Sequence, residues 1–227
     1  MAEPIREIKL PRPLVVVGGP SSVATTIAGT APHTARSGTP VEVLAPNPLR
    51  TSRMVLRPLR ADDRREFLRV VRISRDHLQK WMALHRENES DEALFDRQLE
   101  MCRAGDDRGL AWRRVGMLED GRIGGFFNLN SISRAFTVEA DANWWVSADV
   151  ARIGLGTEGA LAMLDHAFSE SGGLGLHRVQ AAIAPGNTAS ARLAARIGMR
   201  KTESAQVNVM IGGAWERHDL WARTCMD

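Results

Sequence analysis

Apolar residues recur at about every second position through three consecutive segments of this chain, and this pattern is typical of β-strands. The first two segments, Ala111–Leu118 and Arg122–Asn130, flank Glu119-Asp120-Gly121, a sequence typical of a hairpin turn. The third segment is Phe136–Val146. The sequence therefore predicts a sheet with at least three consecutive strands in the middle of the chain.

Helices and further strands lie on both sides of these three strands in the sequence. In chain order we expect a strand over Arg53–Arg57, a helix that Asp62 and Asp63 cap, a helix around Asp76–Leu84, a helix that Ser90 caps, a helix opening at Thr157, a strand over Arg178–Ala184, a helix from Asn187 to Gly198, and a hairpin of Val207–Ile211 with Trp215–Trp221. This order predicts an α/β or α+β domain with a central mixed sheet.

The first fifty residues differ in composition from the rest. Eight of the ten prolines fall within residues 1–48, and the stretch from Val17 to Pro48 is also rich in Gly, Ser, Thr and Ala. Such a segment buries too little apolar area to order itself. We expect residues 1–50 to be an extension, poorly ordered or partly docked, and residues 51–224 to be the folded domain.

Composition limits the functional classes. Cys102 and Cys225 are the two cysteines, without metal-ligand spacing, so we expect a reducing compartment and no metal site. A net charge of +3 without runs of basic and aromatic residues argues against direct nucleic-acid binding. No apolar stretch reaches the roughly 18 residues that span a bilayer. The expected location is the cytoplasm, away from membranes.

One turn is suited to a phosphate group. Ile153-Gly154-Leu155-Gly156-Thr157 follows a predicted strand and opens an amphipathic helix. Glycines at alternate positions let the backbone approach a ligand, and the N–H groups lie at the positive end of the helix dipole. The turn lacks the third glycine of the dinucleotide fingerprint. A plain helix start is the alternative interpretation.

A polar helix start lies about thirty residues further on. Asn187 follows Pro185-Gly186 at the end of a predicted strand, so its side chain can cap the next helix. Either Asn187 is only a cap, or it also faces a ligand held by the glycine turn.

Together the two segments resemble the GNAT family of acyl-CoA-dependent N-acetyltransferases, and more closely its RimJ/RimL branch, which acetylates the N-termini of ribosomal proteins. Four stretches carry the resemblance, which spans about residues 51–224: Leu56–Leu59, Gly154–Glu158, His177–Gln180 with Asn187 and Ser190, and Ile211–Asp219. It implies a mixed, mostly antiparallel sheet flanked by helices.

The resemblance also implies how acetyl-CoA, the cosubstrate, is held. The amides of Ile153, Gly154, Leu155, Gly156 and Thr157 would bind its pyrophosphate. The backbone of Trp144 and Val146 would pair with its pantetheine arm, and Asn187 would contact that arm as well. This chain has Ala151 where the family usually has Gln or Arg, so one side-chain contact of the family lacks its counterpart there.

The chain has no tyrosine, and this decides one mechanistic question. Many relatives use a tyrosine on the last helix as the acid, at the position that corresponds to Ala194. Ser190 is the natural substitute, because it lies one turn after Asn187 on the same helix face. A serine hydroxyl is too weak an acid to transfer a proton unaided, so we expect a hydrogen bond to the leaving thiolate. The alternative is a second capping bond to the backbone.

Acidic side chains offer candidates for the base. Glu139, Asp141 and Asn143 alternate along one predicted strand and therefore share a face, with Trp144 and Val146 on the other. Asp141 occupies the position at which many relatives carry a glutamate, so it ranks first and Glu139 second. A water chain is a third possibility, and a merely solvated strand face is the fourth.

The leading hypothesis is therefore an N-acetyltransferase that moves an acetyl group from acetyl-CoA directly to a protein N-terminal amine. A small amine, such as a polyamine or an aminoglycoside, fits the acidic strand face as well. A non-catalytic acyl-CoA-binding module is the alternative from another class. We expect a monomer or a homodimer.

Overall fold

A computed structural model describes residues 48–211 and 213–227. Their secondary structure, in chain order, is β1 (Leu49–Arg50), β2 (Met54–Arg57), the 3-10 turn η1 (Ala61–Asp63), α1 (Arg64–Leu78), α2 (Asp91–Arg108), β3 (Trp112–Leu118), β4 (Ile123–Arg134), β5 (Val138–Val146), the 3-10 turn η2 (Ala148–Val150), α3 (Leu155–Phe168), β6 (Arg178–Ile183), α4 (Thr188–Arg196), β7 (Arg200–Ile211) and β8 (Ala214–Thr224).

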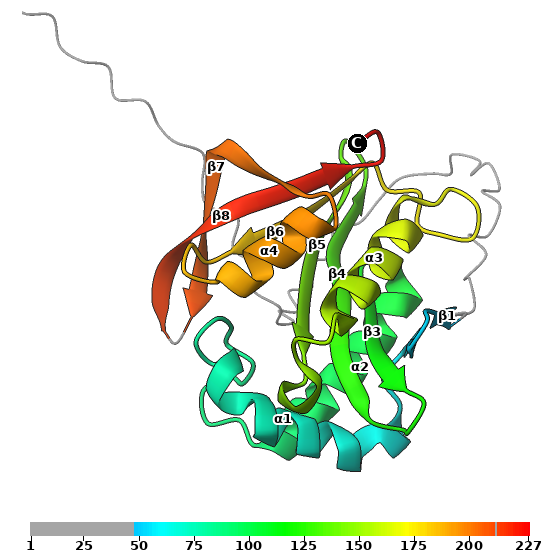
Figure 1. The fold of residues 1–227 in the computed structure, drawn as a ribbon, viewed down its shortest axis with the longest axis vertical. Helices are drawn as coiled ribbons and strands as arrows, with labels where there is room; N and C mark the ends of the chain where they lie inside the picture. Colours follow the sequence, from blue (N-terminus) through cyan, green and yellow to red (C-terminus); the bar gives the residue numbers. More distant parts are fainter. Residues whose placement is uncertain (1–47, 212) are drawn as a thin grey trace, which may run out of the picture. The chain divides into compact units, whose positions relative to one another are not determined.

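All strands of this part of the chain join one sheet, in the order β1-β2-β3-β4-β5-β6-β8-β7 (Figure 1). Every neighbouring pair is antiparallel except β5 and β6, which run parallel. The predicted mixed, mostly antiparallel sheet is confirmed, and so are both predicted hairpins, β3–β4 and β7–β8.

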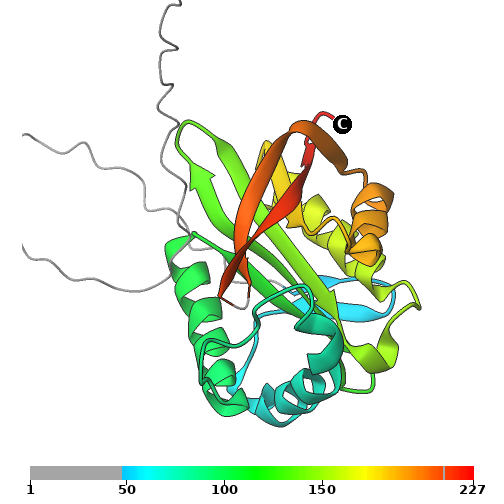
Figure 2. The same cartoon turned by 90° about the vertical axis from the view of Figure 1, so that its left-hand side faces the viewer.

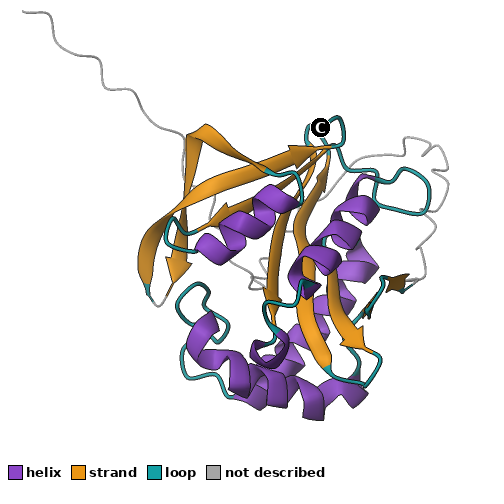
Figure 3. Cartoon of the chain, viewed as in Figure 1, coloured by secondary structure: helices purple, strands orange, loops and turns teal. Residues whose placement is uncertain are grey.

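Helices cover both faces of the sheet (Figures 1 and 3). On one face α1 and α2 pack with Val115, Phe126 and Trp145 of the strands. On the other face α3 and α4 pack against the opposite side chains, such as Phe127 and Val179. Figure 2 shows the sheet between the two helix pairs. Because neighbouring residues of a strand point to opposite faces, Phe126 and Phe127 serve the two cores separately.

Helix α1 corrects one prediction. It runs unbroken through Leu78, residues 79–81 form a turn and residues 82–84 have no regular structure, so the separate helix expected around Asp76–Leu84 is wrong. Ser74 lies inside α1, and its Oγ accepts the N–H of Ala148 at 3.1 Å within the fold. A polar residue with a tertiary partner does not end a helix. Ser90 caps α2 as expected, because its Oγ accepts the N–H of Ala93.

At the start of the described chain, Leu49–Arg50 pairs with β2, although we expected these two residues to belong to the extension. Residues 1–47, on which the rest of that expectation falls, lie outside the described residues. None of the helices in residues 48–211 and 213–227 combines the length and apolar character that a bilayer span needs.

Candidate functional site

Strands β5 and β6 part halfway along the sheet. Their parallel register holds for three pairs, Glu139 with Arg178, Ala140 with Val179 and Asp141 with Gln180. β5 then continues to Val146, and Figure 1 shows the two strands diverging toward the end of β5 from which the chain leads to α3. Within the described residues, the edge of β5 beyond Asp141 has no strand partner on the β6 side.

Backbone groups of alternate residues point to this free edge. Residues of an antiparallel strand alternate between bonding to the partner and pointing away from it. Ser147 N–H donates to Gly124 O at 3.0 Å, which assigns the odd-numbered residues of β5 to the β4 side. The N–H and C=O groups of Ala142, Trp144 and Val146 therefore face the free edge. An extended ligand could add there as a further strand.

Helix α1 holds the end of β5. Besides the Ser74–Ala148 hydrogen bond, Arg69 pairs with Asp149 at 3.0 Å. Burial lowers the pKa of His77 below its usual value. A hydrogen bond from the His77 ring to the backbone of Val146 offsets only part of this shift. The backbone of Val146 is thus already hydrogen-bonded to a side chain of the protein. Among the described residues, no side chain forms such a bond with the backbone of Ala142 or Trp144.

The backbone of the glycine turn leaves N–H groups at the start of α3 without a partner in the helix. Arg152 and Gly154 have left-handed φ angles of 68° and 92°. The first helical hydrogen bond of α3 runs from Glu158 N–H to Gly154 O at 3.1 Å. The N–H groups of Leu155, Gly156 and Thr157 precede it, so they are available to an anion at the positive end of the helix. The helix begins at Leu155, two residues before the predicted start at Thr157.

The carboxylate of Glu158 ties this turn to the start of the domain. Its Oε1 accepts the hydroxyl of Thr51 at 2.6 Å and the N–H of Arg53 at 2.7 Å. Its Oε2 accepts Arg53 Nε at 2.8 Å. Burial alone would raise the pKa of Glu158, but these hydrogen bonds outweigh it and hold the pKa below its usual value. Sequence reasoning assigned no role to Thr51, Arg53 or Glu158.

Helix α4 completes the site from the other side. Asn187 caps it, with Oδ1 accepting Ser190 N–H at 3.1 Å, which leaves the Asn187 amide N–H groups for a ligand. A Cβ on Gly156 would lie 2.8 Å from Leu193 Cδ1 and 3.2 Å from Val146 Cγ2. The first turn of α3, the end of β5 and α4 therefore meet at Gly156. The two segments singled out in the sequence are neighbours in space.

Residues 53–200 match the family described as the acetyltransferase (GNAT) domain. The chain belongs to the GNAT family. A curated relative, the probable N-acetyltransferase YjcK of Bacillus subtilis, is 33% identical over 103 residues, which make up 45% of this chain and 55% of that protein. The chain thus aligns with about half of that relative's length.

Solved structures share the fold. Mycobacterium smegmatis RimJ in complex with CoA-disulfide is 26% identical, with a TM-score of 0.66 over 79% of this chain and 86% of the other. The ribosomal-protein-S5-alanine acetyltransferase of Vibrio fischeri is 22% identical, with a TM-score of 0.68 over 79% of this chain and 97% of the other. The second likeness shows the fold alone.

In this GNAT domain the polar strand face lies where predicted. Glu139, Asp141 and Asn143 face the side of Trp145, away from the side chains of Trp144 and Val146. Asp141 stands at the last pair before β5 and β6 part, and its Oδ1 accepts Gln180 Nε2 at 2.9 Å. Gln180 lies in one of the stretches that resemble the GNAT family, but the sequence alone predicts no role for its side chain.

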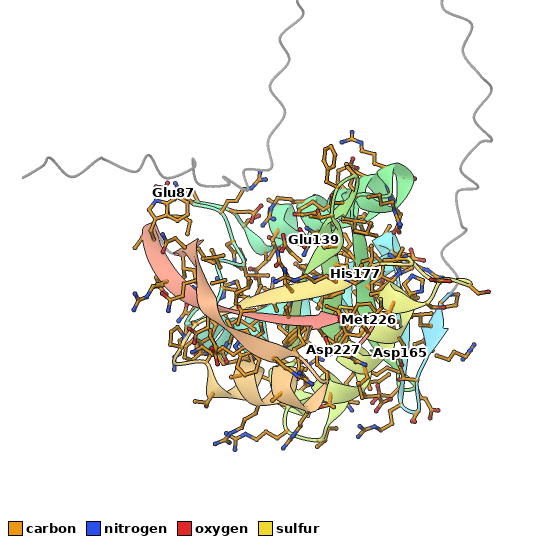
Figure 4. The ribbon with its side chains drawn as sticks, turned by 90° about the horizontal axis from the view of Figure 1, so that it is seen from above. Glu87, Glu139, Asp165, His177, Met226 and Asp227 are labelled. Carbon is orange, nitrogen blue, oxygen red and sulfur yellow. The ribbon has the colours of Figure 1, made fainter. Side chains whose placement is uncertain are left out.

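Glu139 lies further back, in the paired part of β5. Figure 4 shows it near His177 at the end of the sheet where Met226 and Asp227 lie, and His177 N–H donates to Val138 O at 2.7 Å. The structure therefore places Asp141 closer than Glu139 to the free edge of β5.

Other polar candidates have structural partners. His177 Nδ1 lies 3.5 Å from Cys225 Sγ, and the buried His218 bonds the carbonyl of Glu216 through Nδ1. Ala194, at the position of the family tyrosine, is fully buried. Ser190, by contrast, is half-buried, and its hydroxyl makes no hydrogen bond within the described residues.

The tryptophans named in the sequence have different surroundings. Trp112 is buried and packs against His166, with 5.0 Å between ring centroids. Trp144 is partly buried against the α3 and α4 side, and Trp215 is exposed in the β7–β8 hairpin. Residues 48–211 and 213–227 contain no cluster of side chains that could hold a metal ion.

Proposed function

We propose that this GNAT protein is an acetyl-CoA-dependent N-acetyltransferase whose acceptor is a protein N-terminal amine, as in the RimJ/RimL branch. The observation that carries the proposal is the free edge of β5, which ends beside the glycine turn of α3 and the capped start of α4. Family membership supports the reaction, and the likeness to RimJ supports the acceptor.

Two backbone segments and one side chain would form the donor site. The N–H groups from Ile153 to Thr157 would hold the pyrophosphate at the start of α3. Ala142 and Trp144, with Val146 beside His77, would pair with the amide groups of the pantetheine arm. Asn187 would donate its amide N–H to the same arm while its oxygen caps α4.

The fit of the turn can be checked at its glycines. A side chain at Gly156 would collide with Leu193 and Val146, and one at Gly154 would need a strained left-handed backbone. Gly156 thus allows the first turn of α3 to pack closely against α4 and β5, and Gly154 allows the left-handed turn before the helix. This packing and this turn support the proposal that the N–H groups at the start of α3 hold the pyrophosphate.

Acetyl transfer forms a bond between the amine nitrogen and the acetyl carbon and breaks the carbon–sulfur bond of the thioester. The ammonium form of the acceptor must first lose a proton, and the leaving thiolate must be stabilised. We assign the first task to Asp141, because it stands where the strands part and Gln180 fixes one of its oxygens. Glu139 and water remain the second and third choices.

Ser190 would donate its hydroxyl hydrogen bond to the leaving thiolate. Its N–H is engaged by Asn187, so the side chain is held at the first turn of α4. Because position 194 is alanine and the chain has no tyrosine, we assign this role to the hydroxyl of Ser190.

Acetyl-CoA turnover with four acceptors tests the proposal: a peptide beginning with Ala, a peptide beginning with Ser, spermidine and an aminoglycoside. We expect turnover with the peptides. Preference for spermidine or the aminoglycoside would instead establish a small-amine acetyltransferase, consistent with the acidic side chains on the strand face. Binding of acetyl-CoA without turnover of any amine would establish a non-catalytic module.

Variants test the assigned roles. Asp141→Asn should lower kcat by about 100-fold if the carboxylate is the base, and Glu139→Gln, which makes the same change of charge two residues away, should lower it far less. Ser190→Ala should lower kcat by about tenfold, the worth of one hydrogen bond. An unchanged rate in either Asp141→Asn or Ser190→Ala would remove that residue from the mechanism.

A further inference from the structure

The contact between Glu158 and the segment Thr51–Arg53 joins residues 105 positions apart in the sequence. Both oxygens of the carboxylate are occupied, and Arg53 NH2 adds an ion pair to Oε2 at 2.7 Å. The Glu158 side chain is only 16% exposed, so this pair is protected from solvent on one side. Glu158 therefore holds Arg53 in a fixed position beside the glycine turn.

The third guanidinium nitrogen of Arg53 reaches the turn itself. Arg53 NH1 donates to the carbonyl oxygen of Ile153 at 2.7 Å. This carbonyl and the N–H of Gly154 belong to one peptide group, and the chain has no cis peptide bond among the described residues. In a trans peptide the C=O and the N–H point in opposite directions. The N–H of Gly154 therefore points away from Arg53.

Gly154 is the residue that could lose this orientation most easily. It has a φ of 92° and no side chain, so the peptide between Ile153 and Gly154 can rotate at low cost. Rotation would turn the carbonyl oxygen of Ile153, with its negative partial charge, toward the exposed side of the turn. An anion bound there would then meet an acceptor in place of a donor.

We propose that Arg53 is a positioning residue for the donor pyrophosphate: it fixes the peptide between Ile153 and Gly154 so that the Gly154 N–H faces the bound anion. Glu158 and Thr51 hold Arg53 in place for this task. The inference rests on the proposed function, because it assumes that a pyrophosphate binds at this turn.

A comparison of two acetyl donors separates this role from a merely structural one. Acetyl-CoA contains the pyrophosphate, whereas acetyl-pantetheine carries the same thioester and lacks it. Arg53→Gln should raise the KM for acetyl-CoA about tenfold or more, the loss expected for one hydrogen bond to a charged group. It should leave kcat, and kcat/KM for acetyl-pantetheine, within about twofold of the wild-type values.

Arg50→Gln is the matched control. Arg50 is exposed on β1, three residues before Arg53, and no contact between its side chain and the turn is seen among the described residues. Its substitution therefore removes the same charge without disturbing the turn. It should leave the KM for acetyl-CoA unchanged. Arg53→Lys keeps the charge but not the fork of donors, so it should resemble Arg53→Gln and not the wild type.

Equal losses with both donors, or no loss with acetyl-CoA, would overturn the positioning role. A Lys variant with wild-type KM would also overturn it, because charge alone would then suffice. Calorimetric titration of each variant with CoA, below its unfolding temperature, gives the same comparison without turnover.

If the wild-type protein binds CoA but transfers no acetyl group, only the proposed function fails. Equal CoA affinity of the wild type and Arg53→Gln overturns this inference alone.

Discussion

Gly159 is the point at which α3 approaches the sheet most closely. A Cβ built there would lie 2.2, 2.5 and 2.5 Å from three ring atoms of Phe127, whereas ordinary contacts of a Cβ lie at 3.4–4 Å. Phe127 is fully buried, so its ring has no solvent-filled space into which it can move. In Gly159→Ala either the ring must leave its rotamer or the helix must move off β4.

The magnitude follows from two opposing effects. Overpacking of a core costs about 1–3 kcal/mol, and a contact more than an ångström too short belongs at the upper end of this range. Replacing glycine by alanine inside a helix returns about 0.5–1 kcal/mol. We expect a net loss of about 2 kcal/mol in the free energy of unfolding, which lowers Tm by about 4–8 °C for a domain of this size.

Urea and thermal unfolding followed by circular dichroism measure this loss. Phe127→Leu supplies the second arm of a double-mutant cycle, because a smaller side chain leaves room for the new methyl group. Gly156→Ala is the comparison within the same helix, since the atom it meets most closely is the end of the Leu193 side chain. A Gly159→Ala protein as stable as the wild type, or an equal loss in the Phe127→Leu background, would refute the packing argument.

Two other predictions concern stability. Burial, aided by Arg114, lowers the pKa of His166 from 6.5 to about 4, so unfolding takes up a proton in this interval. Stability should therefore fall as the pH drops from 7 to 4, by less than the roughly 3 kcal/mol that the full shift would give because solvent screens the partly exposed ring, and His166→Gln should flatten that slope in urea titrations at several pH values. Asn187→Ala should lose about 1 kcal/mol of cap energy and also bind acetyl-CoA more weakly. Asn187→Asp should keep the cap and lose only donor affinity; tight donor binding by Asn187→Asp would exclude the proposed amide contact.

Much of the donor site could be predicted because its signals are local. A helix start and an Asn cap each depend on a few consecutive residues, and Asn187 caps α4 as expected. The period-two pattern located most strands to within four residues, but β7 begins at Arg200, seven residues before the predicted Val207. The family resemblance then joined the two segments into one site, and their contact at Gly156 is what the structure adds.

The remaining features depend on pairing between distant residues. Nothing near Arg53 in the sequence indicates that it contacts Ile153 and Glu158, and nothing near Asp141 indicates Gln180. Periodicity cannot show where β5 and β6 stop pairing, because both strands continue past that point. Within α1, Ser74 likewise has its partner, Ala148, 74 residues away in the sequence. The roles of Asp141 and Ser190 stay predictions.

The short β5–β6 seam also bears on how the domain responds to its ligand. Among the described strands, the pairing that connects β1–β5 to β6–β8 comprises three residue pairs, whereas β4 and β5 pair along most of their length. A donor that lies along the free edge of β5 and touches α4 would bridge the two ladders where the protein's own hydrogen bonds stop. Occupancy at 100 times Kd would stabilise the fold by about 2.7 kcal/mol, so the unliganded and liganded proteins should differ most in the opening of this seam.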